Sequence, residues 1–349
     1  MKMNYSLIHQ IKNYSRKRST PIKFNKLINY SNNYNNKILR TQFLHKELPI
    51  RISQRIIELN QLPYNLLKLN SMSKVYNLYN ETFRKLIDFK LPKNLNESNK
   101  YSNILETIFK EHAAINNDIA NALITYNNNY KMIKHEEEFI NKILYNFYMS
   151  RLSIRFLIKQ HLIINKNKNN LFGLINEKCN PYNLTQNIIM NIDQMSYIIY
   201  KKYPKIIINN DSYKGNFIYI DSHIEYIVTE ILKNSVRSTM EFGYNSPKIT
   251  IDIKLVKDEL IIKISDNGLG FNRKKLNQLF NFTYSNALID NYIDKKTIIA
   301  GYGHGLGLSR IYSRYFGGDL IIVPFEGVGC DVYIYLSKID TSKENISIV

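Results

Sequence analysis

The stretch that decides the fold is Ser222-His223-Ile224-Glu225-Tyr226-Ile227-Val228-Thr229-Glu230-Ile231-Leu232-Lys233-Asn234-Ser235-Val236-Arg237. Its apolar residues recur at the spacing of one buried helical face: Ile224, Ile227, Val228 and Ile231. A polar stripe with the same spacing follows a different face: Glu230, Asn234, Arg237 and Glu241. The stretch is therefore predicted to be an amphipathic helix. Taken alone, such a stripe is more often a solvated surface than a site.

Two glycine-rich segments follow this helix. The first, Ser265-Asp266-Asn267-Gly268-Leu269-Gly270-Phe271, comes after residues 249–253 and 260–264, which have the pattern of paired strands. The second, Ala300-Gly301-Tyr302-Gly303-His304-Gly305-Leu306-Gly307-Leu308, is predicted to open a helix. Closely spaced glycines let the backbone approach a phosphate, and N–H groups at a helix start favour anions. The order fits neither a Walker P-loop nor a Rossmann fingerprint, and it favours a nucleotide site of another kind.

This order of motifs resembles the GHKL ATP-binding fold, which histidine kinases, gyrase-type ATPases and mitochondrial 2-oxoacid dehydrogenase kinases share. Three segments are similar to motifs of the last of these families. They are Phe43-Leu44-His45-Lys46-Glu47-Leu48-Pro49-Ile50-Arg51, Phe147-Tyr148-Met149-Ser150-Arg151-Leu152-Ser153-Ile154-Arg155, and Gly301 to Leu306 with Gly318-Asp319-Leu320. The resemblance covers roughly residues 25–340.

The resemblance implies an α+β chain of two domains, a four-helix bundle followed by a GHKL (Bergerat) α/β sandwich with a mixed sheet. The residue pattern agrees, since helical periods recur around residues 42–60, 71–91, 100–127 and 136–163. The prolines Pro49, Pro63 and Pro92 are expected to separate these segments. The bundle, with regulatory and lipoyl-docking roles, is expected at 23–170, the kinase domain at 171–340 and a flexible tail at 341–349.

The first 22 residues contain lysine, arginine and serine, and the first acidic residue is Glu47. This composition is typical of a mitochondrial transit peptide, so a mitochondrial matrix location is expected, with a basic tail as the alternative. The net charge of +19 permits an acidic partner, but the basic residues are dispersed, and no nucleic-acid partner is expected. No membrane span is expected either, because no apolar stretch of about 20 residues occurs. Cys179 and Cys330 lack metal-site spacing and fit a reducing compartment.

The resemblance also implies an activity and partners. Members of the family phosphorylate a serine of the E1α subunit of a 2-oxoacid dehydrogenase complex and so inactivate it. They use ATP and Mg²⁺, dock on lipoyl domains of the E2 core and form homodimers. The pyruvate complex is the favoured substrate here, and the branched-chain complex is the alternative. Two other classes stay open: a histidine-kinase-like signalling enzyme, with His135 as its phosphoacceptor, and a non-catalytic GHKL scaffold.

Residue by residue, the resemblance makes Glu230 the general base and Asn234 the Mg²⁺ ligand, and both are expected to contact the bound nucleotide. Lys233 and Arg237 would offset phosphate charge, and Asp266 would accept a hydrogen bond from the adenine amino group. Gly268 and Gly270 would let the chain turn beside the nucleotide, and residues 283–300 would form a lid that orders on ATP. Further nucleotide contacts are expected at Ser285, Asn286, Gly301, Tyr302, Gly303, His304, Gly305 and Leu306.

A second site is expected in the bundle, because Tyr79, His112 and Arg155 match positions that line the family's pocket for small 2-oxoacids. From the residues alone, a lone helical histidine such as His112 is more often part of the core. The sequence also departs from the family. Tyr226 stands four residues before Glu230, where pyruvate-type kinases carry a histidine, and Cys330 stands where they carry threonine. Tryptophan is absent, so the Asp-Trp tail of those kinases is missing.

Overall fold

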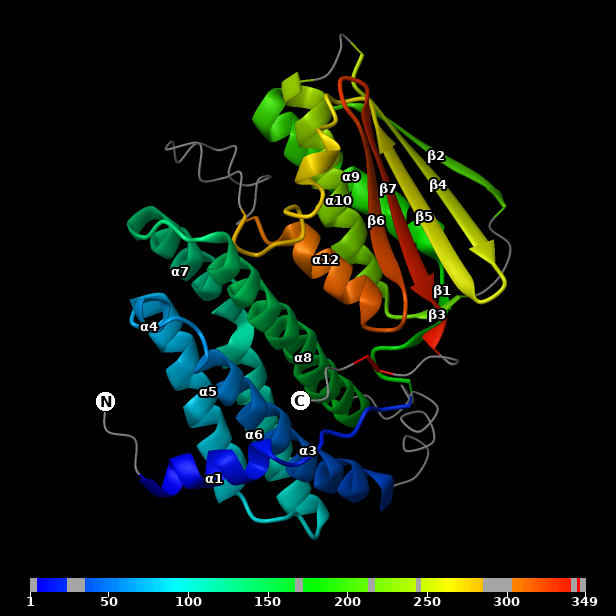
Figure 1. Ribbon diagram of the computed structural model, residues 1–349. Helices are drawn as coiled ribbons and strands as arrows, with labels where there is room; N and C mark the ends of the chain where they lie inside the picture. Colours follow the sequence, from blue (N-terminus) through cyan, green and yellow to red (C-terminus); the bar gives the residue numbers. More distant parts are fainter. Residues whose placement is uncertain are drawn as a thin grey trace. The chain divides into compact units, whose positions relative to one another are not determined.

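The computed structural model describes residues 5–23, 35–166, 172–212, 217–242, 246–284, 303–339 and 344–345 (Figure 1). The chain divides into two compact units, Met1–Leu174 with Ile346–Val349, and Ile175–Asn345. The first unit is helical and the second contains the sheets, which confirms the α+β class. Among the described residues, no helix combines the length and apolar character needed to span a bilayer.

The first unit is built from helices that each bury one face. They are α1 (Tyr5–Ser15), α3 (Asn35–Leu59), α4 (Tyr64–Leu67), α5 (Asn70–Asp88), α6 (Leu95–Glu111), the 3₁₀ turn η1 (His112–Ala114), α7 (Ile115–Asn129) and α8 (Lys134–Lys166). Helix α3 contacts α5, α6 and α8, and α5 contacts α7. Helices α3, α5, α6–α7 and α8 thus form the predicted four-helix bundle, around a core that includes Leu48, Phe83 and Phe147.

Two details of the bundle differ from the prediction. Pro49 does not separate segments but lies inside α3. Its neighbours Leu48 and Ile52 are almost fully buried, so packing on both sides outweighs the hydrogen bond that proline removes. The third predicted helix is broken into α6 and α7 by the 3₁₀ turn at His112–Ala114. Such a break redirects a helix and often marks a functional position.

Residues 5–23 are folded onto the bundle. Helix α1 buries Leu7 and contacts α3. Beyond α1, Glu47 Oε1 accepts the backbone N–H of Thr20 at 2.8 Å, and Arg51 Nη2 donates to the Thr20 carbonyl, also at 2.8 Å. The stretch whose composition predicts a transit peptide therefore covers part of α3 in this fold.

The second unit is a mixed sheet covered by helices. Within the described residues, five strands lie in the order β2 (Lys205–Ser212), β4 (Lys248–Val256), β5 (Glu259–Asp266), β7 (Gly329–Ser337) and β6 (Asp319–Phe325). Strands β2 and β4 are parallel, and the other neighbours are antiparallel. Strands β1 (Asn176–Cys179) and β3 (Phe217–Tyr219) form a small separate sheet.

Three helices lie on one face of the large sheet (Figure 1): α9 (Pro181–Tyr200), α10 (Asp221–Phe242) and α12 (Gly305–Arg314). The strand register explains the choice of face. Ile251 pairs with Ile264, and Ile253 pairs with Ile262, and all four are buried. Because side chains alternate along a strand, this register presents one apolar face to α10 and α12. The strands predicted from the sequence are confirmed as the central parts of β4 and β5.

Candidate active site

Helix α10 carries the predicted catalytic stripe. Its apolar side fixes its rotation, because Ile224, Ile227 and Val228 are fully buried. With that side against the core, Glu230 is partly buried and Asn234 is exposed. The polar stripe therefore lies at the edge of the core, where a ligand can reach it.

The carboxylate of Glu230 lies between a lysine and the start of α12. Lys233 Nζ donates to Glu230 Oε1 over 2.9 Å, and the two side chains are only 13% and 20% exposed. The other oxygen, Oε2, occupies the space that a side chain at Gly305 would need. A negative group is favoured at a helix N-terminus. The fold thus brings the predicted base to the segment predicted to bind phosphate.

The other glycine segment contacts the same helix further along. Gly268 packs so closely on α10 that a Cβ at this position would collide with Ser238 Oγ. Asp266 ends β5, and its Oδ1 accepts the N–H of Gly268 at 3.0 Å. Burial raises the pKa of Asp266 to about 6, and hydrogen bonds from Gly268, Ser235 and the Cys330 backbone only partly oppose this. Gly270 adopts a positive φ of 59° beside the Phe325 carbonyl.

The two glycine segments therefore approach α10 at separate points. Glu230 and Ser238, their contacts on the helix, are eight residues apart, or roughly 12 Å along the axis. The exposed Asn234 lies between them. Both predicted halves of the nucleotide site thus flank one helix, and the predicted metal ligand lies at its centre.

Arg237 is bound to a residue further along the same stripe. Its Nε donates to Glu241 Oε2 at 3.1 Å, and Glu241 Oε1 accepts the hydroxyl of Tyr200 at 3.1 Å. These bonds join α10 to α9. The phosphate contact expected of Arg237 stays a prediction.

His304 supports the start of α12 with its side chain. The ring is buried, and its Nε2 donates to the Phe282 carbonyl at 3.0 Å. Burial lowers the pKa of His304 to about 4, so the ring is neutral at pH 7. The nucleotide contact expected at His304 therefore falls to its backbone. The predicted positions Gly303 and Leu306 lie on either side of His304. Other predicted positions lie outside the described residues, namely Ser285, Asn286, Gly301, Tyr302 and the lid from 285 onwards.

Sequence reasoning missed several residues that join α10 to its neighbours. Ser235 forms a hydrogen bond with Asp266, and Ser238 contacts Gly268. In the sequence, only their three-residue spacing on α10 indicates that the two serines lie near each other on the helix surface. The sequence singles out Tyr226 but not its contact: its ring stacks on Tyr312 of α12, with ring centroids 4.7 Å apart. This stack lies one turn before Glu230 and holds α10 against α12.

In the bundle, two of the three predicted pocket residues are in direct contact. The rings of Tyr79 and His112 lie 4.9 Å apart, and His112 Nε2 shares a hydrogen bond of 2.8 Å with Thr82 Oγ1. Burial, followed by the charges of Arg151, Arg155 and Lys85, lowers the pKa of His112 to about 3. His112 is thus a neutral, hydrogen-bonded core residue, as the residues alone predict.

Arg155 and Arg151 supply the positive charge beside this histidine. Arg155 lies over the Phe109 ring at 4.1 Å. Arg151, which sequence reasoning missed, donates to the His112 carbonyl at 2.7 Å and to Asn116 Oδ1 at 2.9 Å. Its Nη1 is buried without a hydrogen-bond partner in the part of the chain that the structure describes. The signal was its position four residues before Arg155, on one face of α8.

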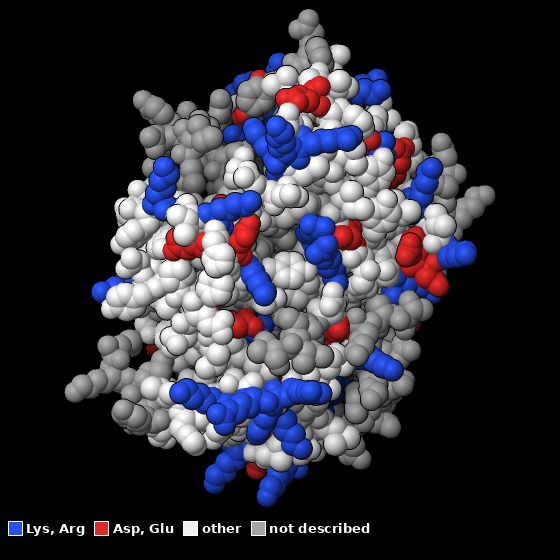
Figure 2. All heavy atoms as spheres, viewed as in Figure 1, with Lys and Arg blue, Asp and Glu red and all other residues white. Residues whose placement is uncertain are grey.

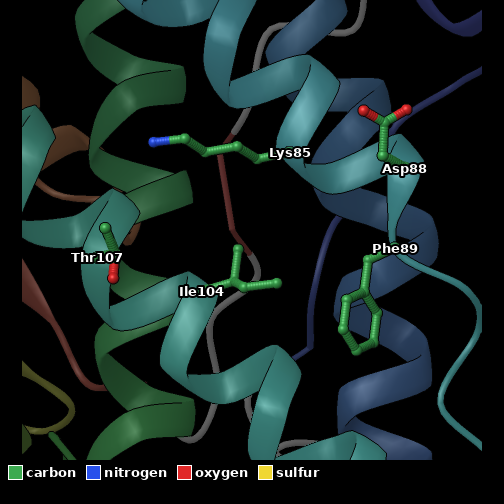
Figure 3. A pocket seen from close by; sticks show the side chains of 5 residues that line it. All are labelled: Lys85, Asp88, Phe89, Ile104 and Thr107. Carbon is green, nitrogen blue, oxygen red and sulfur yellow. The ribbon is translucent and has the colours of Figure 1, made fainter.

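A cavity of about 370 Å³ lies elsewhere in the bundle, between α5 and α6. Figure 3 shows the residues that line it: Lys85, Asp88, Phe89, Ile104 and Thr107. The Lys85 ammonium is bound to Glu111 at 2.7 Å, so its charge is already compensated. None of the predicted site residues is among the residues that line this cavity.

Charged side chains are spread widely over the surface. Figure 2 shows Lys and Arg in several groups on one face, with Asp and Glu scattered among them. This distribution agrees with the dispersed basic residues of the sequence.

Comparisons with known proteins agree with the geometry. Residues 21–198 match the model of the family described as mitochondrial branched-chain alpha-ketoacid dehydrogenase kinase. Residues 220–339 match the family described as histidine kinase-, DNA gyrase B-, and HSP90-like ATPase. The second match spans α10, both described glycine segments and four of the five described strands of the large sheet, all except β2.

Three similar proteins are pyruvate dehydrogenase kinases by name. A mitochondrial [pyruvate dehydrogenase (acetyl-transferring)] kinase of Arabidopsis thaliana is 33% identical over 88% of this chain and 87% of that protein. Isozyme 1 of the same kinase from Homo sapiens is 30% identical over 86% of this chain and 73% of that protein. Isozyme 3 from Mus musculus is 30% identical over 98% of this chain and 88% of that protein.

Proposed function

The chain belongs to the mitochondrial 2-oxoacid dehydrogenase kinase family of the GHKL superfamily, and we propose that it is an ATP-dependent protein kinase of the pyruvate dehydrogenase type. The observation that carries the proposal is the carboxylate of Glu230, bound to Lys233 and set against the start of α12. The three relatives described above match most of its length and are pyruvate dehydrogenase kinases, which favours the pyruvate complex over the branched-chain complex. Their names also support a mitochondrial location.

The residues of α10 suit phosphoryl transfer to a serine. Glu230 would accept the proton of the serine hydroxyl or orient the hydroxyl for attack. Lys233 holds that carboxylate and adds positive charge near the transferred group, where charge stabilisation supplies most of the catalysis. Asp266, at the other end of the site, would accept a hydrogen bond from the purine amino group.

The donor set fits Mg²⁺ bound with ATP. The exposed amide oxygen of Asn234 is a hard ligand, one turn from Glu230. Within the described ranges, no three His, Cys, Asp or Glu side chains form a metal cluster. Mg²⁺ usually takes few protein ligands and keeps phosphate oxygens and waters. When bound, Mg²⁺ would offset the charge of the phosphates.

ATP affinity is expected to depend on pH through Asp266. Its pKa of about 6 lies above the ordinary value of 3.8, so below pH 6 the buried carboxyl holds a proton and is a weaker acceptor. We expect the Kd for ATP to rise several-fold between about pH 7 and pH 5, measured by calorimetry. Asp266→Asn should flatten this dependence, and Asp252→Asn, on the outer face of β4, should not. An unchanged slope in Asp266→Asn would contradict the assignment.

The same pKa predicts the sign of a stability effect. Between pH 3.8 and 6 the folded chain holds a proton on Asp266 that the unfolded chain has released. The stabilising contribution of this carboxyl is therefore complete below pH 3.8 and is lost as pH rises through 6.

The proposed activity is tested with labelled ATP and purified E1α subunits of the pyruvate and branched-chain complexes, assayed in parallel. We expect acid-stable label on serine of the pyruvate E1α. Stronger label on the branched-chain E1α would reassign the substrate. Acid-labile label on the chain itself, lost in His135→Gln, would support the histidine-kinase class. Bound ATP without any transfer would support the scaffold class.

We further propose that the cluster of Tyr79, His112, Arg151 and Arg155 binds a small 2-oxoacid. The buried Nη1 of Arg151 is an unused donor among the described residues, and His112 is neutral. A carboxylate would receive a charge-assisted hydrogen bond there and compensate the buried positive charge.

Arg151→Met is expected to raise the concentration of 2-oxoacid that halves kinase activity by at least about tenfold, since it removes one charge-assisted bond. The ratio of activity with and without oxoacid is the measurement, with Arg155→Ala as a second variant. Arg84→Met, an exposed position on α5, is the control. Equal oxoacid inhibition of all these variants would reject the pocket.

The partners expected from the family are also part of the proposal. Docking on the E2 lipoyl domain is measured by titrating that domain, with and without its lipoyl group. A homodimer through the sheet face that carries Ile321 and Phe325, each 45% exposed, predicts the mass of two chains in light scattering. A monomer at micromolar concentration would reject the proposed dimer.

Protease protection in intact and opened mitochondria tests the matrix location.

A further inference from the structure

We propose that Gly305 is a positioning residue for Glu230, because the missing side chain leaves the space in which the carboxylate rests. A Cβ at Gly305 would collide with Glu230 Oε2 and would lie 3.2 Å from its Cδ and 3.6 Å from its Cγ. The inference rests on the proposed function, since it gives the base of that reaction its place. It assigns Gly305 a role beyond offering a backbone N–H to phosphate.

The backbone of Gly305 does not itself require glycine. Gly305 is the first residue of α12 and is not among the residues with positive φ, unlike Gly303 at +81°. Alanine is the better helix former, so local conformation would favour it at this position. The close approach of Glu230 therefore supplies a physical reason for the absent side chain.

Neighbouring contacts limit how far the carboxylate could move away. Its other oxygen is held by Lys233 at 2.9 Å. The stack of Tyr226 on Tyr312, with centroids 4.7 Å apart, joins α10 to α12 one turn earlier. A methyl group at 305 would thus rotate the Glu230 side chain out of place, while the N–H of residue 305 would stay at the helix start.

These contacts couple the base to the phosphate side of the site. The carboxylate and the first N–H groups of α12 share one small volume, so the position of the base depends on the position of that helix start. Alanine at 305 should separate two roles that glycine combines. Backbone binding of phosphate survives the change, and placement of the base does not.

The test is a double-mutant cycle that combines Gly305→Ala with Glu230→Asp, whose carboxylate is one methylene shorter. We expect Gly305→Ala to lower kcat on E1α by about 30-fold or more while the Kd for Mg·ATP changes less than about threefold. In the Glu230→Asp background, the same added methyl group at 305 should lower kcat by less than about threefold, because the shorter side chain already leaves the space beside residue 305 empty.

Gly307→Ala is the matched control on the same helix, since its Cβ would meet Phe282 and the Phe280 carbonyl and not Glu230. Its effect should be the same in both backgrounds. Equal effects of Gly305→Ala in both backgrounds, or a loss of ATP affinity that matches the loss of kcat, would overturn the inference.

A crystal structure of Gly305→Ala provides a readout that does not need activity. We expect the Glu230 carboxylate to move by more than about 1 Å with the start of α12 in place, since the added carbon needs the volume of a methyl group. An unmoved carboxylate would overturn the inference even in an active enzyme. Absence of E1α phosphorylation by the unaltered chain would instead reject the proposed function, and the structural comparison would still decide the role of Gly305.

Discussion

Replacing Glu230 by glutamine is expected to lower kcat for serine phosphorylation by about 10²- to 10⁴-fold, the range that a general acid–base group usually contributes. The amide has nearly the same shape, so it fits the space beside Gly305 that the carboxylate occupies. It cannot accept the serine proton, and it weakens the bond from Lys233, which now spans 2.9 Å. The expected loss lies in kcat, measured by single turnover with saturating Mg·ATP.

Glu225→Gln is the matched control for this substitution. Glu225 lies on the same helix, undergoes the same chemical change and is exposed. It should retain activity within about twofold, as surface substitutions usually do. ATP affinity, measured by calorimetry, should be similar in both variants. Full activity of Glu230→Gln, or equal losses in the two variants, would remove Glu230 from the role of base.

Helix α10 and strands β4 and β5 of the second unit could be predicted because each leaves a periodic signal. The buried face of α10 repeats every three to four residues, and the central isoleucines of β4 and β5 repeat every second residue. Contacts between elements leave no such signal. That Glu230 meets Gly305, and Ser235 meets Asp266, depends on how helices cross and strands pair over stretches of 31 to 75 residues.

The bundle shows the same limit. Its helices were predictable, but the break at His112–Ala114 was not, because the sequence on both sides stays helical in pattern. The prediction that Pro49 separates two segments was wrong, because the burial of its neighbours decides whether the helix continues. The residues before Ile22 have the charge pattern of a transit peptide, and in the fold the backbone of Thr20 forms hydrogen bonds with the side chains of Glu47 and Arg51. A composition pattern cannot reveal partners that lie some 30 residues away.

The buried contacts of Arg51 are expected to have a large effect on the stability of the fold. Arg51→Met is expected to lower the free energy of unfolding by about 3–5 kcal/mol, the usual cost of breaking a buried ion pair on one side. Arg51 and Glu47 are 1% and 3% exposed, and Arg51 Nε lies 2.8 Å from Glu47 Oε1. Arg51 also donates to Ser153 and to the Thr20 carbonyl. Methionine would leave the carboxylate buried without its charged partner. Urea unfolding followed by circular dichroism measures the change.

A double variant separates the ion pair from the packing. Glu47→Leu with Arg51→Met removes both charges, so it should be more stable than Arg51→Met alone. Lys110→Met, which breaks the exposed pair with Glu106, should change stability by less than about 1 kcal/mol. A loss below about 1 kcal/mol in Arg51→Met would contradict the buried-pair argument. Because Glu47 accepts the amide proton of Thr20, that amide should exchange faster in the double variant even where global stability recovers. Unchanged protection there would mean that α1 and its apolar contacts, rather than the ion pair, hold residues 17–23 on the bundle.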